Sequence, residues 1–258
     1  MNWVITAAIV VLVPISTFGQ ETAANIIKQS VAVNNRDWQA APQFDCTERD
    51  RDKNGTKTDA TTMILGSPYE RLIAEKGHPL SGSKAAEAQK KFEDEVAKRR
   101  RESPDDRSAR IAKYQAERKR DHTMMEQLTA AFDFELSGKQ KIKSRTVYVL
   151  KATPRKGYKP PDRDSEVLTG MEGTLWIDKK TFQWVKVEAH VIHPVTIEGF
   201  LAQVEPGTKF ELEKSPVTPD IWLPKHFSMR SNARVLFVAS RHSQEDDTYF
   251  NYHKATIQ

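Results

Sequence analysis

The histidine pair His190 and His193 is one place in the sequence where side chains could bind a metal, because imidazole is a common zinc ligand. The surrounding residues alternate between apolar and polar and predict a strand over 182–193. Residues three apart on a strand point to opposite faces, so the two rings cannot bind one ion without a bulge. Glu188 shares a face with His190, but no third ligand accompanies them. We therefore predict no metal site here.

Two other groups of reactive residues lack the pattern that catalysis needs. Cys46 has no His or Asn near it in the sequence, so we interpret it as a small residue of a buried strand. The acidic run Glu245, Asp246 and Asp247 is expected in a solvated turn before the last strand, since a calcium site needs a fuller set of oxygen ligands. No Gly-rich phosphate loop, nucleophile elbow or HExxH motif occurs. We predict that the protein is not an enzyme, with no catalytic residue and no cofactor.

Composition limits the classes of protein further. The 258 residues are 38% hydrophobic and 29% charged, with a net charge of +5 and a single cysteine. One cysteine excludes an internal disulfide framework and any multi-cysteine metal site. Residues 83–121 hold 13 Lys and Arg against 9 Asp and Glu, so most of the excess positive charge is local. The basic balance therefore gives no reason to predict nucleic-acid binding.

The first 19 residues are typical of a secretory signal peptide. Residues 3–13 form an uncharged apolar run that Pro14 ends, and small residues at 17 and 19 suit cleavage after Gly19. The run is too short to span a membrane, which takes about 20 apolar residues, and no later segment approaches that length. No cysteine follows that could carry a lipid anchor. We expect a periplasmic protein in which residues 20–258 form a single domain, without a transmembrane segment and as a monomer.

The N-terminal part of this domain is predicted to be a helix followed by an antiparallel meander. Apolar residues at 23, 26, 27 and 31 have helical spacing. Asn54-Gly55 then predicts a hairpin with a type I′ turn, because both residues tolerate positive φ. A third strand is expected over 69–76, ending at Gly77-His78-Pro79.

Residues 83–121 predict a charged helical insertion that Ser103-Pro104 divides into two helices. Its few apolar residues, which include Phe92 and Ile111, predict a helical hairpin with a thin apolar seam. We interpret the pair as solvated helices held by i,i+4 ion pairs. The alternative is a basic arm for an anionic lipid or nucleic acid. Met124, Met125, Leu128 and Phe132 then continue at helical spacing and predict a core helix.

Strands dominate the remainder of the chain. They are expected over 145–153, 170–178, 182–193, 208–212, 221–231, 234–240 and 248–253. A three-residue loop over 179–181 would place Trp176 opposite Trp184 and Leu175 opposite Val185, and this register separates an apolar face from a mixed one. The apolar face would carry Leu175, Ile177, Val185, Val187 and Val191, and the other Trp176, Phe182, Trp184, Glu172, Lys186 and Glu188.

Several strings in a fixed order also carry a family resemblance. RLIAEKGHPLS (71–81), FDFELSGK (132–139), YVLKATPRKGYKPP (148–161), GTLWIDKKTFQWVKVEA (173–189) and DIWLPKHF (220–227) resemble secreted bacterial proteins of the periplasmic lipoprotein-carrier superfamily, which is LolA/LolB-like. The resemblance implies an α+β fold in which helices cover the concave face of a strongly curved antiparallel sheet, an incomplete β-barrel, and leave a cavity for acyl chains. The charged helical insertion departs from the true carriers.

These observations lead to one functional hypothesis and two alternatives. We predict a non-catalytic envelope protein that holds a hydrophobic ligand, a lipid or a lipoprotein acyl chain, between sheet and helices. Leu236 and Val238 would add apolar area, and the predicted ligand-binding side chains are Leu175, Ile177, Val185, Val187, Phe210, Leu212, Phe227 and Met229. The first alternative is an envelope scaffold with a filled core that contacts a protein partner. The second is a hydrolase with a site assembled from scattered residues.

Overall fold

The computed structural model describes residues 21–197, 202–235 and 239–257. The predicted signal peptide, residues 1–19, lies outside these ranges, as do Leu236 and Val238. No helix in the described part of the chain is long and apolar enough to cross a membrane.

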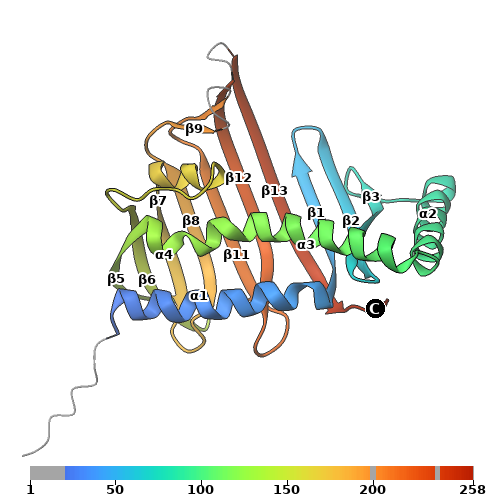
Figure 1. The fold of residues 1–258 in the computed structure, drawn as a ribbon, viewed down its shortest axis with the longest axis horizontal. Coiled ribbons are helices and arrows are strands. Elements are labelled where there is room, and N and C mark those ends of the chain that lie inside the picture. The colour runs from blue at the N-terminus through green and yellow to red at the C-terminus, as the bar shows by residue number, and fades with distance from the viewer. Residues whose placement is uncertain (1–20, 198–201, 236–238, 258) are drawn as a thin grey trace, which may run out of the picture.

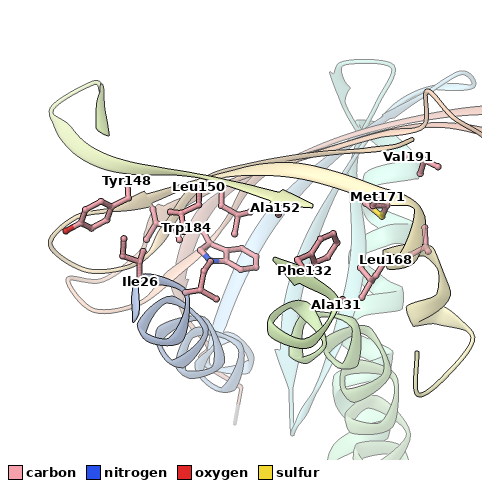
Figure 2. Packing of buried hydrophobic residues seen from close by; sticks show 14 of the residues in the cluster. Ile26, Ala131, Phe132, Tyr148, Leu150, Ala152, Leu168, Met171, Trp184 and Val191 are labelled. Carbon is pink, nitrogen blue, oxygen red and sulfur yellow. The ribbon is translucent and has the colours of Figure 1, made fainter. Parts of the chain in front are cut away.

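One antiparallel sheet forms the body of the molecule (Figure 1), as the resemblance implied. Its main path runs in the order β4-β3-β2-β1-β13-β12-β11-β8-β7-β6-β5, with β9 and β10 attached beside β12. The strands are β1 (Phe44–Asp52), β2 (Gly55–Ile64), β3 (Ser67–Glu75), β4 (His78–Pro79), β5 (Phe132–Ile142), β6 (Arg145–Pro154), β7 (Met171–Asp178), β8 (Trp184–Val191), β9 (Val195–Ile197), β10 (Ala202–Val204), β11 (Lys209–Pro216), β12 (Trp222–Val235) and β13 (Ala239–Lys254). The end strands β4 and β5 do not pair with each other, so the sheet is open. The sheet is also curved (Figure 2) and forms an incomplete barrel.

Helices lie across one face of the sheet, which curves around them in Figures 1 and 2. They are α1 (Ala23–Ala40), α3 (Pro104–Glu126) and α4 (Leu128–Ala131), whereas α2 (Gly82–Arg100) lies beside β3 at one end of the sheet; short 3₁₀ turns occur at Ala41–Gln43 and Asp164–Gly170. The core forms where α1, α4 and the second 3₁₀ turn meet β5–β8. Its fully buried members include Ile26, Leu150 and Ile177. This α+β architecture agrees with the fold class that the sequence predicted.

The α1 helix begins at Thr22, whose side chain accepts a hydrogen bond from the Asn25 amide. Of the predicted apolar residues, Ile26 and Ile27 are buried and those at 23 and 31 are partly buried, whereas the second half of the helix buries polar residues. Asp37, which is 1% exposed, pairs with the Lys214 ammonium at 2.9 Å. The Trp222 amide and the Gln183 side chain also donate to this carboxylate. This network fastens the C-terminal half of α1 to the sheet.

The insertion divides at Ser103-Pro104 as predicted, but its helices do not form a hairpin. Figure 1 shows α2 end-on beside β3, whereas α3 runs across the strands toward α4. The few apolar residues contact the sheet instead of each other: the rings of Phe92 and Tyr69 are 5.9 Å apart, and Ile111 lies against the turn at Gly66. The helices therefore diverge because their apolar residues pack at different positions, Phe92 against β3 and Ile111 against the β2–β3 turn.

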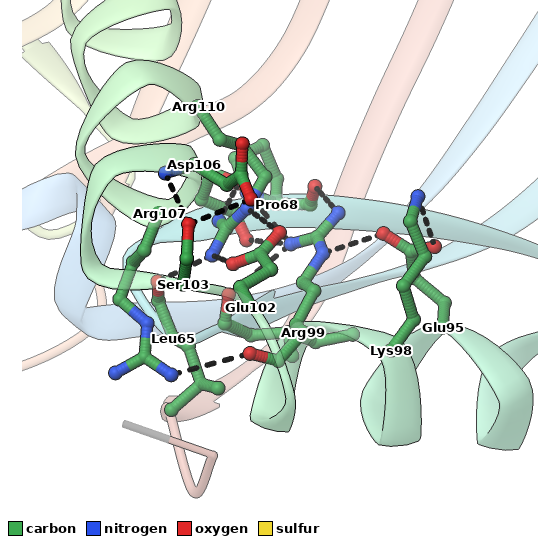
Figure 3. Close-up of polar contacts among 12 residues, drawn as sticks. Leu65, Pro68, Glu95, Lys98, Arg99, Glu102, Ser103, Asp106, Arg107 and Arg110 are labelled. Atoms are coloured by element: carbon green, nitrogen blue, oxygen red, sulfur yellow. Dashed lines mark hydrogen bonds and ion pairs between the residues drawn. The ribbon is translucent and has the colours of Figure 1, made fainter.

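The basic run at the end of α2 is predicted to be solvated, but one of its arginines is buried and holds the helix to the sheet. Arg99 is 6% exposed and its guanidinium donates to the carbonyls of Ile64, Ser67 and Pro68, which surround the β2–β3 turn (Figure 3). Glu95, one helical turn earlier, accepts from the Arg99 Nε at 2.7 Å. Arg110 of α3 adds a bond to the Leu65 carbonyl. Both helices of the insertion are thus fixed to one turn.

The other end of α3 is attached to α1 through aromatic stacking. The rings of Trp38 and His122 are parallel, with centroids 4.2 Å apart. The Arg118 guanidinium lies 4.5 Å from the Trp38 ring centroid and donates to the Trp38 carbonyl. Burial lowers the pKa of His122, so its ring stays neutral and can stack at neutral pH.

Several predicted boundaries were wrong. The helical spacing across Met124 to Phe132 does not continue into one helix, because α4 ends at Ala131 and Phe132 opens the edge strand β5. The strand predicted over 221–231 is part of β12. The strand predicted over 234–240 covers the end of β12 and the start of β13, with 236–238 outside the described residues. The acidic run at 245–247, predicted in a solvated turn, lies within β13. Long strands carry polar residues here because pairing with neighbouring strands satisfies their backbone hydrogen bonds, whatever the side chains are.

The β1–β2 hairpin is confirmed, whereas the predicted turn type was wrong. Its turn residues are Lys53 and Asn54, and Gly55 already pairs with Asp52. The Asp52 carboxylate accepts from the amides of Asn54 and Gly55 at 2.7 and 3.1 Å, which fixes the turn by side-chain bonding. Positive φ at two successive turn residues occurs instead at Leu65 and Gly66.

The predicted register of the β7–β8 hairpin was also wrong. Leu175 pairs with Val187 and Ile177 with Trp184, and the register shifts at Val185. This bulge turns Trp184 into the core, where its indole nitrogen donates to the Ser30 hydroxyl of α1. The simple alternation that we assumed on β8 had placed Trp184 on the opposite, more exposed face beside Trp176.

Candidate functional site

An apolar cavity of about 340 Å³ lies between the sheet and the helices. Met125 and Leu128 on the helical side, together with Val167 and Leu168 of the 3₁₀ turn, contribute to its lining. Phe132, Leu168 and Met171, three of its walls, are visible in Figure 2. The complete lining is Met125, Leu128, Phe132, Phe134, Ala152, Val167, Leu168, Met171, Glu172, Gly173, Leu175, Trp184, Val187, Glu188, Ala189, Phe210 and Phe227.

A row of small residues across three neighbouring strands makes this space. Ala152 of β6 pairs with Gly173 of β7, which in turn pairs with Ala189 of β8. Continuing outward, Phe134 of β5 pairs with Ala152, and Phe210 of β11 pairs with Ala189. Directly paired residues point to the same side of a sheet. These five residues therefore place two phenylalanine rings on one face, with three very small residues between them. We call Ala152, Gly173 and Ala189 the small-residue row.

The central position of the row has no space for a larger residue. A Cβ atom on Gly173 would come within 2.6 Å of the Glu188 carbonyl oxygen and 3.3 Å of the Ala189 Cβ. The close approach of β7 and β8 at this point therefore requires glycine. This keeps the middle of the row free of side-chain atoms.

The structure brings together four of the eight side chains that the sequence predicted as ligand-binding. Leu175, Val187, Phe210 and Phe227 line the cavity. The other four lie elsewhere: Ile177 is fully buried in the core near α1, Leu212 packs against that core, Val185 is at the β8 bulge, and Met229 is half-buried on β12 beyond Phe210. Sequence reasoning missed the small-residue row, because pairing three separate segments requires their registers.

The remaining concave face carries a group of carboxylates. Phe227 of the cavity pairs with Asp247, and Asp247 pairs with Asp50 of β1, so all three share a face. Glu48 pairs with both Tyr249 and Asp59 on this same face. We call the following six residues the acidic half of the sheet: Glu48, Asp50, Asp59, Glu70, Glu245 and Asp247.

Mutual repulsion and burial alter the protonation of this acidic half. Asp247 is 4% exposed, and burial together with the carboxylates of Glu245, Glu48 and Asp50 raises its pKa to about 7. Burial, followed by repulsion from Glu70 and Asp50, likewise raises the pKa of Asp59. Part of the acidic half therefore holds protons close to neutral pH.

The other candidate residues are placed as follows. His190 on β8 contacts the Glu172 carboxylate of β7 at 3.0 Å, and His193 lies exposed beyond the end of β8. Cys46 is half-buried in β1, and burial raises the pKa of its thiol to about 11, which keeps it protonated and weakly nucleophilic. Within the described residues no group of three or more His, Cys, Asp or Glu side chains is arranged to hold a metal ion.

Comparison with known proteins gives similarity at the level of fold. No protein-family model matches the chain, and no curated protein matches it significantly. A LolA superfamily protein from Nitrosomonas europaea is 12% identical, covering 93% of this chain and 96% of its own, with a TM-score of 0.35. Over comparable lengths a DUF1329 family protein from Desulfovibrio piger is 12% identical, covering 91% and 94%, with a TM-score of 0.35. An outer membrane lipoprotein-sorting protein domain from Vibrio parahaemolyticus is 10% identical, covering 89% and 93%, with a TM-score of 0.32.

Proposed function

We propose that this protein is a periplasmic, non-catalytic carrier that holds the apolar chain of a lipid or a lipoprotein in the cavity above the small-residue row. The observation that supports this most directly is the row itself. Ala152, Gly173 and Ala189 leave space where neighbouring strands place aromatic or aliphatic side chains. A void of this kind in a filled core would cost stability, about 24 cal/mol for each Å³. Selection for a guest molecule explains why such a space would persist.

The chemistry of the walls supports an apolar ligand. Most of the lining side chains are aliphatic or aromatic, and Glu172 and Glu188 are the only ionisable ones. At about 340 Å³ the cavity falls within the range of about 300–1,000 Å³ typical of small-molecule sites. Burying a chain there would gain about 0.8 kcal/mol for each methylene group. An alkyl chain fits these requirements better than a polar metabolite.

The proposal is tested by substituting larger side chains into the small-residue row. We expect the purified, delipidated protein to bind the uncharged apolar fluorophore N-phenyl-1-naphthylamine in a saturable manner. Ala152→Phe and Ala189→Phe each place a ring in the cavity, and should weaken binding about tenfold or more, equivalent to about 1.4 kcal/mol. Ala86→Phe is the matched control, because Ala86 is exposed on α2 far from the cavity.

Overpacking can also destabilise a protein by about 1–3 kcal/mol, so thermal unfolding of each variant is measured in parallel. Two variants on different strands guard against loss of binding through misfolding of one. Failure of the wild-type protein to take up the fluorophore would overturn the carrier function. Unchanged uptake by both folded cavity variants would show that the fluorophore binds elsewhere.

A protein-interaction role is the second candidate, and the exposure of α2 favours it. The ion pairs on its outer surface, Lys90 with Asp94 and Lys91 with Glu87, have side chains at least 65% exposed. This leaves a solvated, charged helix at one end of the sheet. A scaffold would keep its partner when the cavity is filled, whereas a carrier would lose its cargo, so the Ala152→Phe variant separates the two roles.

A further inference from the structure

A surface groove of about 640 Å³ lies between α1 and the junction of α4 with β5. The α1 helix contributes residues three, four and seven apart, which form one side of a helix. The lining consists of Ala24, Ile27, Lys28, Val31, Thr129, Asp133, Phe134 and Arg155. Its floor is therefore apolar and its rim is charged.

The groove and the cavity share a wall. Phe134 lines both spaces, and Thr129 of the groove follows Leu128 of the cavity along α4. Phe134 is partly buried and lies against Phe132, with ring centroids 6.2 Å apart. Phe134 is therefore the side chain common to both linings, and an alkyl chain that extends from the groove to the cavity would pass its ring.

The charges at the rim do not cancel. Arg155 donates to the Asp133 carboxylate at 2.8 Å and to the Phe132 carbonyl at 2.8 Å, so this arginine and aspartate neutralise each other. Lys28 is exposed, and its ammonium makes no hydrogen bond or ion pair with any residue that the structure describes. The rim therefore presents one uncompensated positive charge above an apolar floor.

We propose that this groove is the access route to the cavity, and that the ligand is an amphiphile whose anionic head group, a carboxylate or a phosphate, pairs with Lys28 while its alkyl chain passes Phe134. This inference rests on the proposed carrier function and adds the head-group charge and the route. An apolar floor that leads to an apolar cavity suits the chain, and the uncompensated cation at the rim suits the anion.

The head-group prediction is tested with three ligands of equal chain length: dodecanoate, dodecyl phosphate and dodecan-1-ol. Each displaces N-phenyl-1-naphthylamine from the full protein at concentrations below micelle formation. We expect Lys28→Gln to weaken binding of the two anions about threefold, as for an exposed ion pair, and to leave dodecan-1-ol unchanged. Lys113→Gln, an exposed lysine on α3, is the control. The stronger of the two anions identifies the preferred head group.

The route is tested with a matched pair of tryptophan substitutions on α1. Ala24 and Ala32 are both exposed, but only Ala24 lines the groove. Ala24→Trp should slow fluorophore association in stopped-flow measurements several-fold, whereas Ala32→Trp should leave the rate unchanged. Equal rates in both variants would overturn the route, and equal loss of acid and alcohol binding in Lys28→Gln would overturn the head-group assignment. If the wild-type protein binds no apolar probe, the carrier function itself is overturned.

Discussion

The two halves of the concave face are built on one continuous sheet, yet the side chains that they present to their helices differ. The cavity half, formed by β5–β8 and β11, packs its apolar residues against α1 and α4 and still encloses an unfilled space. The acidic half, formed by β13 and β1–β3, presents carboxylates beneath α3, and its helices are fixed by guanidinium groups at the sheet margin. Strand pairing therefore accommodates both an apolar surface and an acidic one. The side chains on each half, and the helices that cover them, determine which molecules that half could hold.

Each half contains a buried cation that joins a helix to the sheet. In the cavity half, Lys214 reaches Asp37 and Asn34 of α1, and burial lowers the pKa of this lysine although Asp37 opposes the shift. In the acidic half, Arg99 reaches the carbonyls of the β2–β3 turn. If the halves are independent, a substitution that removes one of these cations should leave the other half folded.

The largest expected effect comes from removing the anchor of the acidic half. Arg99→Leu leaves three carbonyls without their donor and Glu95 without its partner, so we expect a loss of about 3–5 kcal/mol in the free energy of unfolding. Denaturant unfolding measures the loss, and amide exchange should accelerate in β2 and β3. Arg100→Leu, one residue along on the exposed side of α2, should change stability by less than about 0.5 kcal/mol.

The same variant tests the separation of the halves. Fluorophore uptake by the folded fraction of Arg99→Leu should match the wild type, because the cavity lies at the other end of the sheet. Loss of uptake in protein that is still folded would mean that the two halves form a single cooperative unit.

A smaller effect with the opposite sign is expected at Asp247. Its pKa rises from 3.8 to about 7 on folding, so the folded state binds the extra proton between those values and stability falls as pH increases from about 4 to 7. Asp247→Asn removes this charge. We expect the variant to gain about 1 kcal/mol relative to wild type at pH 8, with the gain shrinking toward pH 4. Unfolding curves at several pH values measure it, and a gain that is independent of pH would contradict the repulsion.

The smallest effect is expected on the outer surface of α2. Lys91→Ala breaks an i,i+4 pair with Glu87 whose side chains are 66% and 65% exposed. Water screens such pairs, so the free energy of unfolding should fall by no more than about 0.5 kcal/mol. A loss comparable to that of Arg99→Leu would show that α2 is held by its surface charges and not by its buried anchor.

Local signals in the sequence predicted much of the fold. The Ser103-Pro104 break is confirmed, with the Ser103 hydroxyl capping α3 and Pro104 at its first turn. The β1–β2–β3 meander followed from turn residues and short alternating segments. These features depend on neighbours within a few positions, which is the range over which residue type and spacing are informative.

Long-range features escaped prediction for physical reasons. The β8 bulge at Val185 reverses the side on which Trp184 lies, and a one-residue shift cannot be recognised from alternation alone. Arg99 stands among four consecutive basic residues, and only its orientation toward the β2–β3 turn distinguishes it from the exposed Arg100. The small-residue row joins three segments whose alanines and glycine are unremarkable until their strands are paired.

The small-residue row also limits the length of an alkyl chain that the cavity could hold. On the side of this row the wall consists of backbone and two methyl groups on paired strands, which cannot move aside as a long side chain can. Each carbon added at Ala152 or Ala189 would shorten the longest chain that fits, while the Gly173 position admits no addition at all. Under the proposed carrier function, chain-length preference could therefore be changed in steps at two positions without altering the helices that cover them.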